Sequence, residues 1–221
     1  MDRQDAISSM TVEDTPGAGA GRIRRPEQRR AATSALIEAA IAQLSDAGMR
    51  GLTHRKVEQE AGLAQGSTKY YFGTTDALAE AVLQHLADLD LPLVHAFTDA
   101  GRDADARGDD GDLLRQARAV AAAMLARPDH VRARFHLYLD ASGDPRREAI
   151  VAEARNRFVS AIAESLPGPS SEAAARFVCA VIDGILLDQV SAPDPVVSEH
   201  TATYILAAGA AAQHIAQRTD S

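Results

Sequence analysis

The chain has 221 residues, of which 46% are hydrophobic and 24% charged, enough to bury the core of one large domain or two small ones. Its single cysteine, Cys179, excludes a disulfide framework and a zinc site built on several thiolates. No apolar run reaches the roughly 20 residues that span a bilayer, and the charged first residues lack the apolar stretch of a secretory signal. We therefore expect a cytoplasmic protein that does not contact a membrane.

The net charge of −8 is distributed unevenly along the chain. Residues 22–70 carry nine basic and five acidic side chains, a net charge of +4, which leaves −12 for the rest. A basic head on an acidic body is typical of a DNA-binding protein with a separate regulatory domain. Ordinary scatter of surface charge is the alternative explanation.

The N-terminal segment is rich in Gly, Ala, Ser, Thr and Asp and ends in a basic stretch. This composition predicts a disordered basic arm over residues 1–25. Pro26 suits the first turn of a helix, and Gly48 is placed to end that helix in the left-handed conformation. The apolar residues between them recur at helical spacing: Leu36, Ile37, Ala40, Ile41 and Leu44.

Two short helices and one longer helix are predicted next. Thr53 is expected to cap the first short helix, and Gly62 ends it. Residues 65–72 form the second short helix. Thr74 then caps the longer helix, which we expect to run to Pro92.

The rest of the chain also predicts helices, separated by an acidic loop at 101–111. They are expected near 112–127, 129–141, 145–165, 171–190 and 196–217. No stretch alternates convincingly with period two, so we expect no sheet. We predict an all-α fold, with an N-terminal three-helix helix-turn-helix domain over 26–74 and a helical dimerisation and effector-binding domain over 75–221.

The second short helix carries side chains that can reach base edges and phosphates, namely Gln65, Ser67, Lys69 and Tyr70. Gly66 lets the backbone approach DNA closely. Arg55 and Lys56 lie in the first turn of the preceding helix, where that helix would cross the phosphate backbone. The alternative is a three-helix packing unit with an ordinary polar face. A run of exposed residues from Lys69 to Tyr71 favours DNA binding, because adjacent exposed tyrosines need a partner.

Three segments resemble the signature of the tetracycline-repressor (TetR) family of transcription regulators. They are residues 51–57 (GLTHRKV), 61–72 (AGLAQGSTKYYF) and 76–78 (DAL), and the resemblance covers roughly residues 29–86. The resemblance implies that six side chains face DNA: Arg55, Gln65, Ser67, Lys69, Tyr70 and Tyr71.

The chain departs from the family pattern at four positions. Ala64 stands where a capping Ser is common, Thr68 replaces a usually apolar residue, and Lys69 replaces a common Tyr. Thr75 stands where a Lys often contacts phosphate, and we keep it as a candidate DNA contact. These departures affect the expected operator sequence and leave the DNA-binding role unchanged.

The predicted helix at 171–190 is apolar almost all round, so we expect it to be buried on two sides, one of them against a partner subunit. The resemblance implies that this helix and the last one pair with their symmetry mates in a four-helix bundle. The candidate dimer contacts are Ile182, Ile185, Leu186, Tyr204, Ala208, Ala211, Ala212 and Ile215. The alternative is a monomer with a central helix.

An effector pocket in such folds lies among the middle helices. The candidate lining residues are His95, Phe97, Met124, Phe135, His136, Tyr138, Leu139, Phe158 and Asp183. Each of them has a plain packing role as its alternative. Asp183 must be paired, because it lies in an apolar helix. A backbone amide, an Arg across the dimer and a cationic or hydroxylated effector are its candidate partners, and we favour a structural role.

No HExxH, GxSxG, P-loop or Rossmann motif occurs in the sequence, so we expect no enzyme activity, no metal and no cofactor. The sequence predicts a homodimeric regulator that binds double-stranded DNA and, as a repressor, is released from its operator by a small-molecule effector. The alternative is a helix-turn-helix scaffold or interaction protein without small-molecule control.

Overall fold

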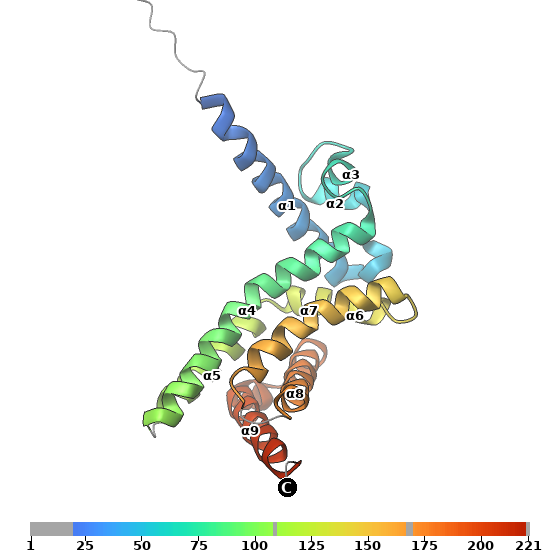
Figure 1. The fold of residues 1–221 in the computed structure, drawn as a ribbon. Coiled ribbons are helices and arrows are strands. Elements are labelled where there is room, and N and C mark those ends of the chain that lie inside the picture. The colour runs from blue at the N-terminus through green and yellow to red at the C-terminus, as the bar shows by residue number, and fades with distance from the viewer. Residues whose placement is uncertain (1–19, 108–109, 167–169, 220–221) are drawn as a thin grey trace, which may run out of the picture.

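The computed structural model describes residues 20–107, 110–166 and 170–219 of the chain. The elements in these ranges are helices, and no strand occurs among them, as the all-α prediction required (Figure 1). In chain order they are α1 (Ala20–Gly51), α2 (His54–Glu60), α3 (Ser67–Phe72), α4 (Thr75–Arg107), α5 (Asp110–Leu125), α6 (Pro128–Asp140), α7 (Pro145–Ala163), α8 (Ser171–Ser191) and α9 (Pro195–Thr219).

The molecule is elongated, with its first and last helices at opposite ends. Figure 1 shows α1, α2 and α3 at one end and the α8–α9 pair at the other, with α4 running from the first end towards the second. The helices α5, α6 and α7 lie between the two ends. We call α1–α3 the head and α4–α9 the body.

The head has a hydrophobic core that is shared with the body. Leu36, Ile41 and Leu44 of α1 are almost completely buried, as their helical spacing predicts. Residues of α4 and α6 complete this first core, including Leu78, Val82, Leu86, Ala133 and Leu137. The head is therefore anchored on two body helices rather than tethered by a linker.

A second core fills the far half of the body. It contains Val94 of α4, Met124 of α5, Val131 of α6, Val159 of α7 and Val178 of α8. Because α4 and α6 contribute to both cores, a displacement of either helix in the second core must also disturb the first.

Most of the predicted helix ends are confirmed. Thr53 caps α2, where its Oγ1 accepts from the backbone N–H of Lys56 at 3.4 Å, and Thr74 Oγ1 accepts from Ala77 N–H at 3.1 Å. Gly62 follows α2 with a φ of 65°. Gly48 also has a positive φ of 60°, but its ψ of −158° lies outside the left-handed helical region, and α1 continues across this kink to Gly51.

Three further predicted boundaries are wrong. The arm expected over 1–25 is helical from Ala20 onward, and its residues 1–19 lie outside the described ranges. The fourth helix does not end at Pro92 but continues to Arg107, because Leu91, Leu93 and Val94 keep packing into the second core while the proline itself is exposed. The loop expected at 101–111 is helical except at 108–109, which the structure does not describe.

Candidate nucleic-acid interface and effector cavity

The two short helices of the head are joined by residues 61–66, which turn the chain sharply. Gly62 and Gly66 both have positive φ, of 65° and 94°, a conformation that a side chain disfavours. Gly66 directly precedes α3 and supplies no side-chain cap. The glycine at 66 is therefore explained by backbone conformation, whether or not the backbone also approaches DNA.

A buried carboxylate in α2 supplies the cap that α3 lacks. Glu58 is only 4% exposed, and its Oε1 accepts from the backbone N–H of Thr68 at 2.9 Å. Burial acts to raise the pKa of Glu58, but hydrogen bonds from the backbone of Thr68 and then of Gly66 outweigh it, so the pKa lies below its ordinary value of 4.5. From the sequence alone, Glu58 counts only as one of the five acidic residues of segment 22–70. No sequence signal links it to Thr68, ten residues further along the chain.

Thr68, one of the departures from the family pattern, has a structural role. Its side chain is fully buried, and its Oγ1 lies 3.5 Å from the carbonyl oxygen of His54. Together with Glu58, it holds α3 against α2. The missing cap at Ala64 is thus compensated from another helix, and the carbonyl oxygen of Ala64 accepts from Ser67 Oγ at 2.6 Å instead.

Most of the predicted DNA contacts lie at the surface of the head. The exposed ones are Arg55, Lys56, Gln65, Gly66, Lys69 and Tyr70, the last with 79% of its side chain accessible. Ser67 and Thr75 are half-buried. The expectation that two adjacent tyrosines are exposed is wrong for Tyr71, which packs against the first core and meets the Tyr70 ring edge-on at 4.9 Å between centroids.

Polar and charged side chains join the helices of the body to one another and to α1 of the head. Arg147 of α7 donates to Asp76 of α4 at 2.9 Å and to Asp140 of α6 at 2.5 Å. Elsewhere, Glu38 of α1 lies 3.2 Å from His85 of α4 and 3.8 Å from His130 of α6. These contacts join the same two helices, α4 and α6, that belong to both cores.

The body contains two cavities that adjoin each other. The larger, of about 350 Å³, lies among α4, α5, α7, α8 and α9. A smaller one of about 40 Å³ reaches α6. Four lining residues are common to both: Val94, Met124, Ile162 and Ile182. The space is large enough for a small organic molecule.

Five of the nine predicted effector residues line these cavities: Phe97, Met124, Tyr138, Phe158 and Asp183. The other four do not. His95 and His136 are exposed, Leu139 is 75% exposed, and Phe135 packs in the second core. Helical periodicity places residues on faces but does not say which face meets the cavity, which explains these errors.

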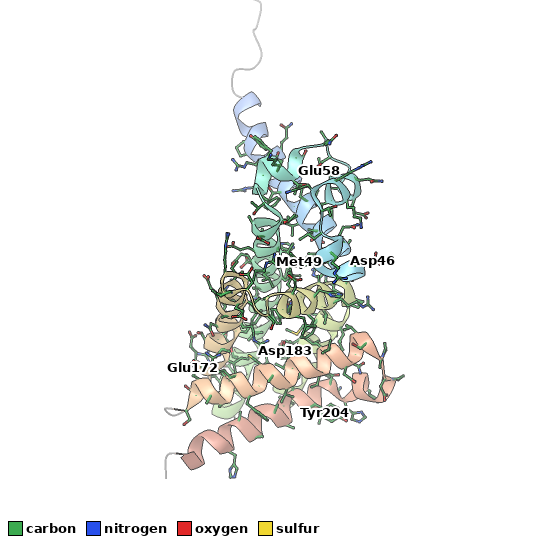
Figure 2. All side chains as sticks on the ribbon, turned by 90° about the vertical axis from the view of Figure 1, so that its right-hand side faces the viewer. Asp46, Met49, Glu58, Glu172, Asp183 and Tyr204 are labelled. Atoms are coloured by element: carbon green, nitrogen blue, oxygen red, sulfur yellow. The ribbon has the colours of Figure 1, made fainter. Side chains whose placement is uncertain are left out.

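The two arginines at the polar end of the smaller cavity, Arg134 and Arg155, were not predicted from the sequence. Arg155 of α7 donates through Nη1 to Asp183 Oδ2, so the carboxylate pairs with an arginine of its own chain. Figure 2 shows Asp183 between α8 and the helices above it. Burial raises the pKa of the neighbouring Cys179 thiol to about 11, with Asp183 adding to the shift, so this cysteine stays protonated at neutral pH.

The predicted dimer contacts divide into two groups. Tyr204 and Ala211 are exposed and Ile185 is half-buried, whereas the side chain of Ile215 lies outside the described part. The prediction is wrong for Leu186, Ala208 and Ala212, which are buried within the protomer, whereas Ile182, which is partly buried and lines the cavities, stays a prediction. Tyr204 of α9 is one of three large apolar side chains exposed on these two helices, with Phe177 and Leu187 of α8, each 42–43% exposed. Figure 2 shows Tyr204 on α9, at the end of the molecule away from the head.

Within the described ranges, no helix is long and apolar enough to cross a membrane, and no three His, Cys, Asp or Glu side chains cluster as metal ligands would.

Two family models match the chain. Residues 36–82 match the bacterial regulatory proteins of the tetR family, and residues 108–211 match the tetracyclin repressor-like C-terminal domain. The HTH-type transcriptional regulator BetI of Burkholderia lata is 26% identical over 191 residues, which cover 82% of this chain and 89% of BetI.

Solved structures of similar proteins share the fold over most of its length. A TetR-family member from Streptomyces coelicolor A3 is 27% identical with a TM-score of 0.59, covering 82% of this chain and 98% of that one. The multidrug binding protein EbrR complexed with imidazole is 29% identical with a TM-score of 0.59, covering 85% of this chain and 92% of EbrR. EbrR also appears complexed with ethidium and with malachite green. With a helix-turn-helix head that matches the family's N-terminal model and a helical body that matches its C-terminal model, this chain belongs to the TetR family of bacterial transcriptional regulators.

Proposed function

We propose that the protein is a transcriptional repressor that binds double-stranded DNA as a homodimer and leaves its operator when a small molecule occupies the body. The exposed face of α3, next to the basic first turn of α2, is the observation that carries the DNA-binding part. Lys69 and Tyr70 are exposed there, while the buried contacts of Glu58 and Thr68 fix the helix behind them. A rigidly held helix with an exposed polar face suits entry into a major groove.

The side chains of this face divide by chemistry. Arg55, Lys56 and Lys69 supply positive charge for phosphates, which gives affinity without reading sequence. Gln65 can pair with the edge of a base, and Tyr70 offers a ring and a hydroxyl group. We retain Ser67, Tyr71 and Thr75 as further contacts whose half-buried side chains leave them less reach.

The dimer part of the proposal rests on the exposed apolar face of α8 and α9. Phe177, Leu187 and Tyr204 are large apolar side chains on a surface with small neighbours, including Ala180, Gly184 and Ala211. Such a face suits an isologous contact with a second copy, through which two heads would read half-sites one helical turn apart, roughly 34–36 Å.

The proposed control by a small molecule rests on the cavities and on α4, which extends from them to the core of the head. Val94 of α4 lines both cavities, and the same helix carries Leu78 and Val82 in the core of the head. A ligand that prefers one tilt of α4 would alter the spacing of the two heads, and only such a preference shifts the equilibrium. EbrR, with a body of similar fold, is a multidrug binding protein.

The proposal is tested by selecting duplexes from a random DNA pool with the purified full chain. We expect enrichment of a sequence with two related half-sites, and loss of that enrichment in the double variant Lys69→Ala and Arg55→Ala. No enrichment by the wild-type protein, or equal enrichment by the double variant, would leave only a helix-turn-helix interaction protein. We propose no catalytic step for this chain and expect it to act in the cytoplasm, where the operator DNA is.

A further inference from the structure

Three side chains form a wall between the small internal cavity and an open groove on the outside of the body. The cavity is lined by Tyr138 of α6, Arg155 of α7 and Asp183 of α8. The groove outside is also lined by Tyr138 and Arg155, but not by Asp183. Asp183 thus lines the cavity but not the groove, whereas Arg155 lines both.

Arg155 occupies a site shaped for a cation. Its Nη1 donates to Asp183 Oδ2, and its guanidinium carbon lies 5.3 Å from the centroid of the Tyr138 ring. A carboxylate and the face of an aromatic ring are the two groups that attract a desolvated cation in proteins. The side chains of Arg155 and Asp183 retain 34% and 23% of their exposure, so the pair is partly hydrated rather than sealed.

The second arginine of this cavity is already neutralised. Arg134 donates to Asp90 of α4, and its side chain is 8% exposed. Its charge is thereby committed to a pair that joins α6 and α4. Arg155, which is paired with Asp183, is therefore the cation that a positively charged ligand could replace at the polar end of the smaller cavity.

The two partners of this pair differ in their freedom to move. Arg155 has a long side chain that can turn into the groove, where Glu148 also lies. Asp183 has a short side chain on α8, which limits how far its carboxylate can move from the cavity. A departure of Arg155 alone would leave a partly buried carboxylate without its partner, a cost that a second cation in the same place offsets. An anion in the same place would face Asp183 and be repelled.

We propose that the effector is a hydrophobic organic cation whose charged group displaces Arg155 from Asp183 and whose apolar body extends into the larger cavity. This inference rests on the proposed function, because it names the ligand class of the same cavity. The apolar side chains of Phe97, Met124 and Val178 line the larger cavity, and Met124 supplies an adaptable surface at its junction with the smaller one.

The test uses three probes with the same ten-carbon chain: decyltrimethylammonium, decanol and decanoate. Calorimetric titration of the full-length wild-type protein should give the tightest binding for the cation and the weakest for the anion. Asp183→Asn should weaken binding of the cation by about tenfold or more, the effect of losing a charge-assisted contact, and leave decanol unchanged. Arg155→Gln should strengthen binding of the cation, because it removes the competing internal charge.

Asp188→Asn is the matched control, since Asp188 lies on the same helix but is exposed and does not line either cavity. It should leave all three affinities unchanged. If decanoate binds most tightly and Arg155→Gln weakens it, the effector is an anion and the inference is wrong. If all three probes bind equally, the ligand class is wrong while the proposed ligand cavity stands. If no probe binds, both the cavity assignment and the inference fail.

Discussion

Glu58 shows how one side chain can determine the geometry of a recognition helix. It is nearly inaccessible, and its carboxylate holds the first turn of α3 from a position on α2. Because its pKa is lowered in the folded protein, ionised Glu58 stabilises the fold above the ordinary pKa of 4.5. That stabilisation is lost as the pH falls through the folded-state pKa.

We therefore predict that Glu58→Gln lowers the melting temperature at pH 7, and that its difference from wild type shrinks as the pH is lowered below 4.5. Thermal unfolding followed by circular dichroism over a pH series measures this. Glu60→Gln, an exposed change on the same helix, should match wild type throughout. The proposed role of this carboxylate would be contradicted if Glu58→Gln had the wild-type melting temperature at pH 7. It would also be contradicted if the difference in melting temperature did not change with pH.

Single residues also show why part of the site could not be predicted from sequence. The exposed positions of α3 follow from a short helix of known phase, and most of them are where the sequence placed them. Glu58, Arg155 and Arg134 were missed because their roles depend on partners at 10, 28 and 44 positions along the chain. Helical periodicity identifies a polar residue but not the distant group with which it pairs.

At the scale of elements, the order of the helices could be predicted but their exact ends could not. Proline was expected to end α4 at Pro92, yet burial of the following apolar residues outweighs the lost hydrogen bond. The partner of each apolar face was also ambiguous. Leu186 and Ala208 face the interior of their own protomer, and periodicity alone cannot distinguish such a face from one that meets a second copy.

The junction of α1 with α6 offers a test at this scale. Gly48 has φ and ψ of 60° and −158°, a region that only glycine adopts readily, and a Cβ there would lie 3.0 Å from His136 Nδ1. Gly48→Ala should therefore reduce the free energy of unfolding by about 1–3 kcal/mol, measured by urea denaturation.

A companion variant separates backbone strain from steric contact at Gly48. In a His136→Ala background the contact is removed, so Gly48→Ala should remain destabilising but less so. A neutral effect of Gly48→Ala in both backgrounds would show that the kink does not require glycine.

At the scale of the whole molecule, the apolar face of α8 and α9 must be covered if the protein is a dimer. Leu187→Glu should yield a monomer in sedimentation experiments, because it places a charge within that face. Since both heads must bind together, operator affinity should fall by about a hundredfold or more.

Leu139→Glu is the matched control for this change, because Leu139 is an even more exposed leucine, on α6. It should leave the dimer intact. A stable wild-type monomer at micromolar concentration, or a dimer of Leu187→Glu, would refute the proposed interface.

The charge distribution of the whole chain makes one measurement decisive for DNA binding. A basic head must release counterions from the duplex although the chain as a whole is acidic. The measurement is the affinity for the selected duplex over a salt series, for wild type, Lys69→Ala and the exposed body variant Arg118→Ala. We predict that wild-type affinity falls steeply as salt concentration rises. Lys69→Ala should bind more weakly, and its slope of log affinity against log salt concentration should be smaller by about one for each head of the dimer. Arg118→Ala should match wild type in both affinity and slope. DNA binding by the exposed face of α3 would be contradicted if Lys69→Ala kept the affinity and the salt dependence of the wild type. It would also be contradicted if Arg118→Ala lost as much affinity as Lys69→Ala.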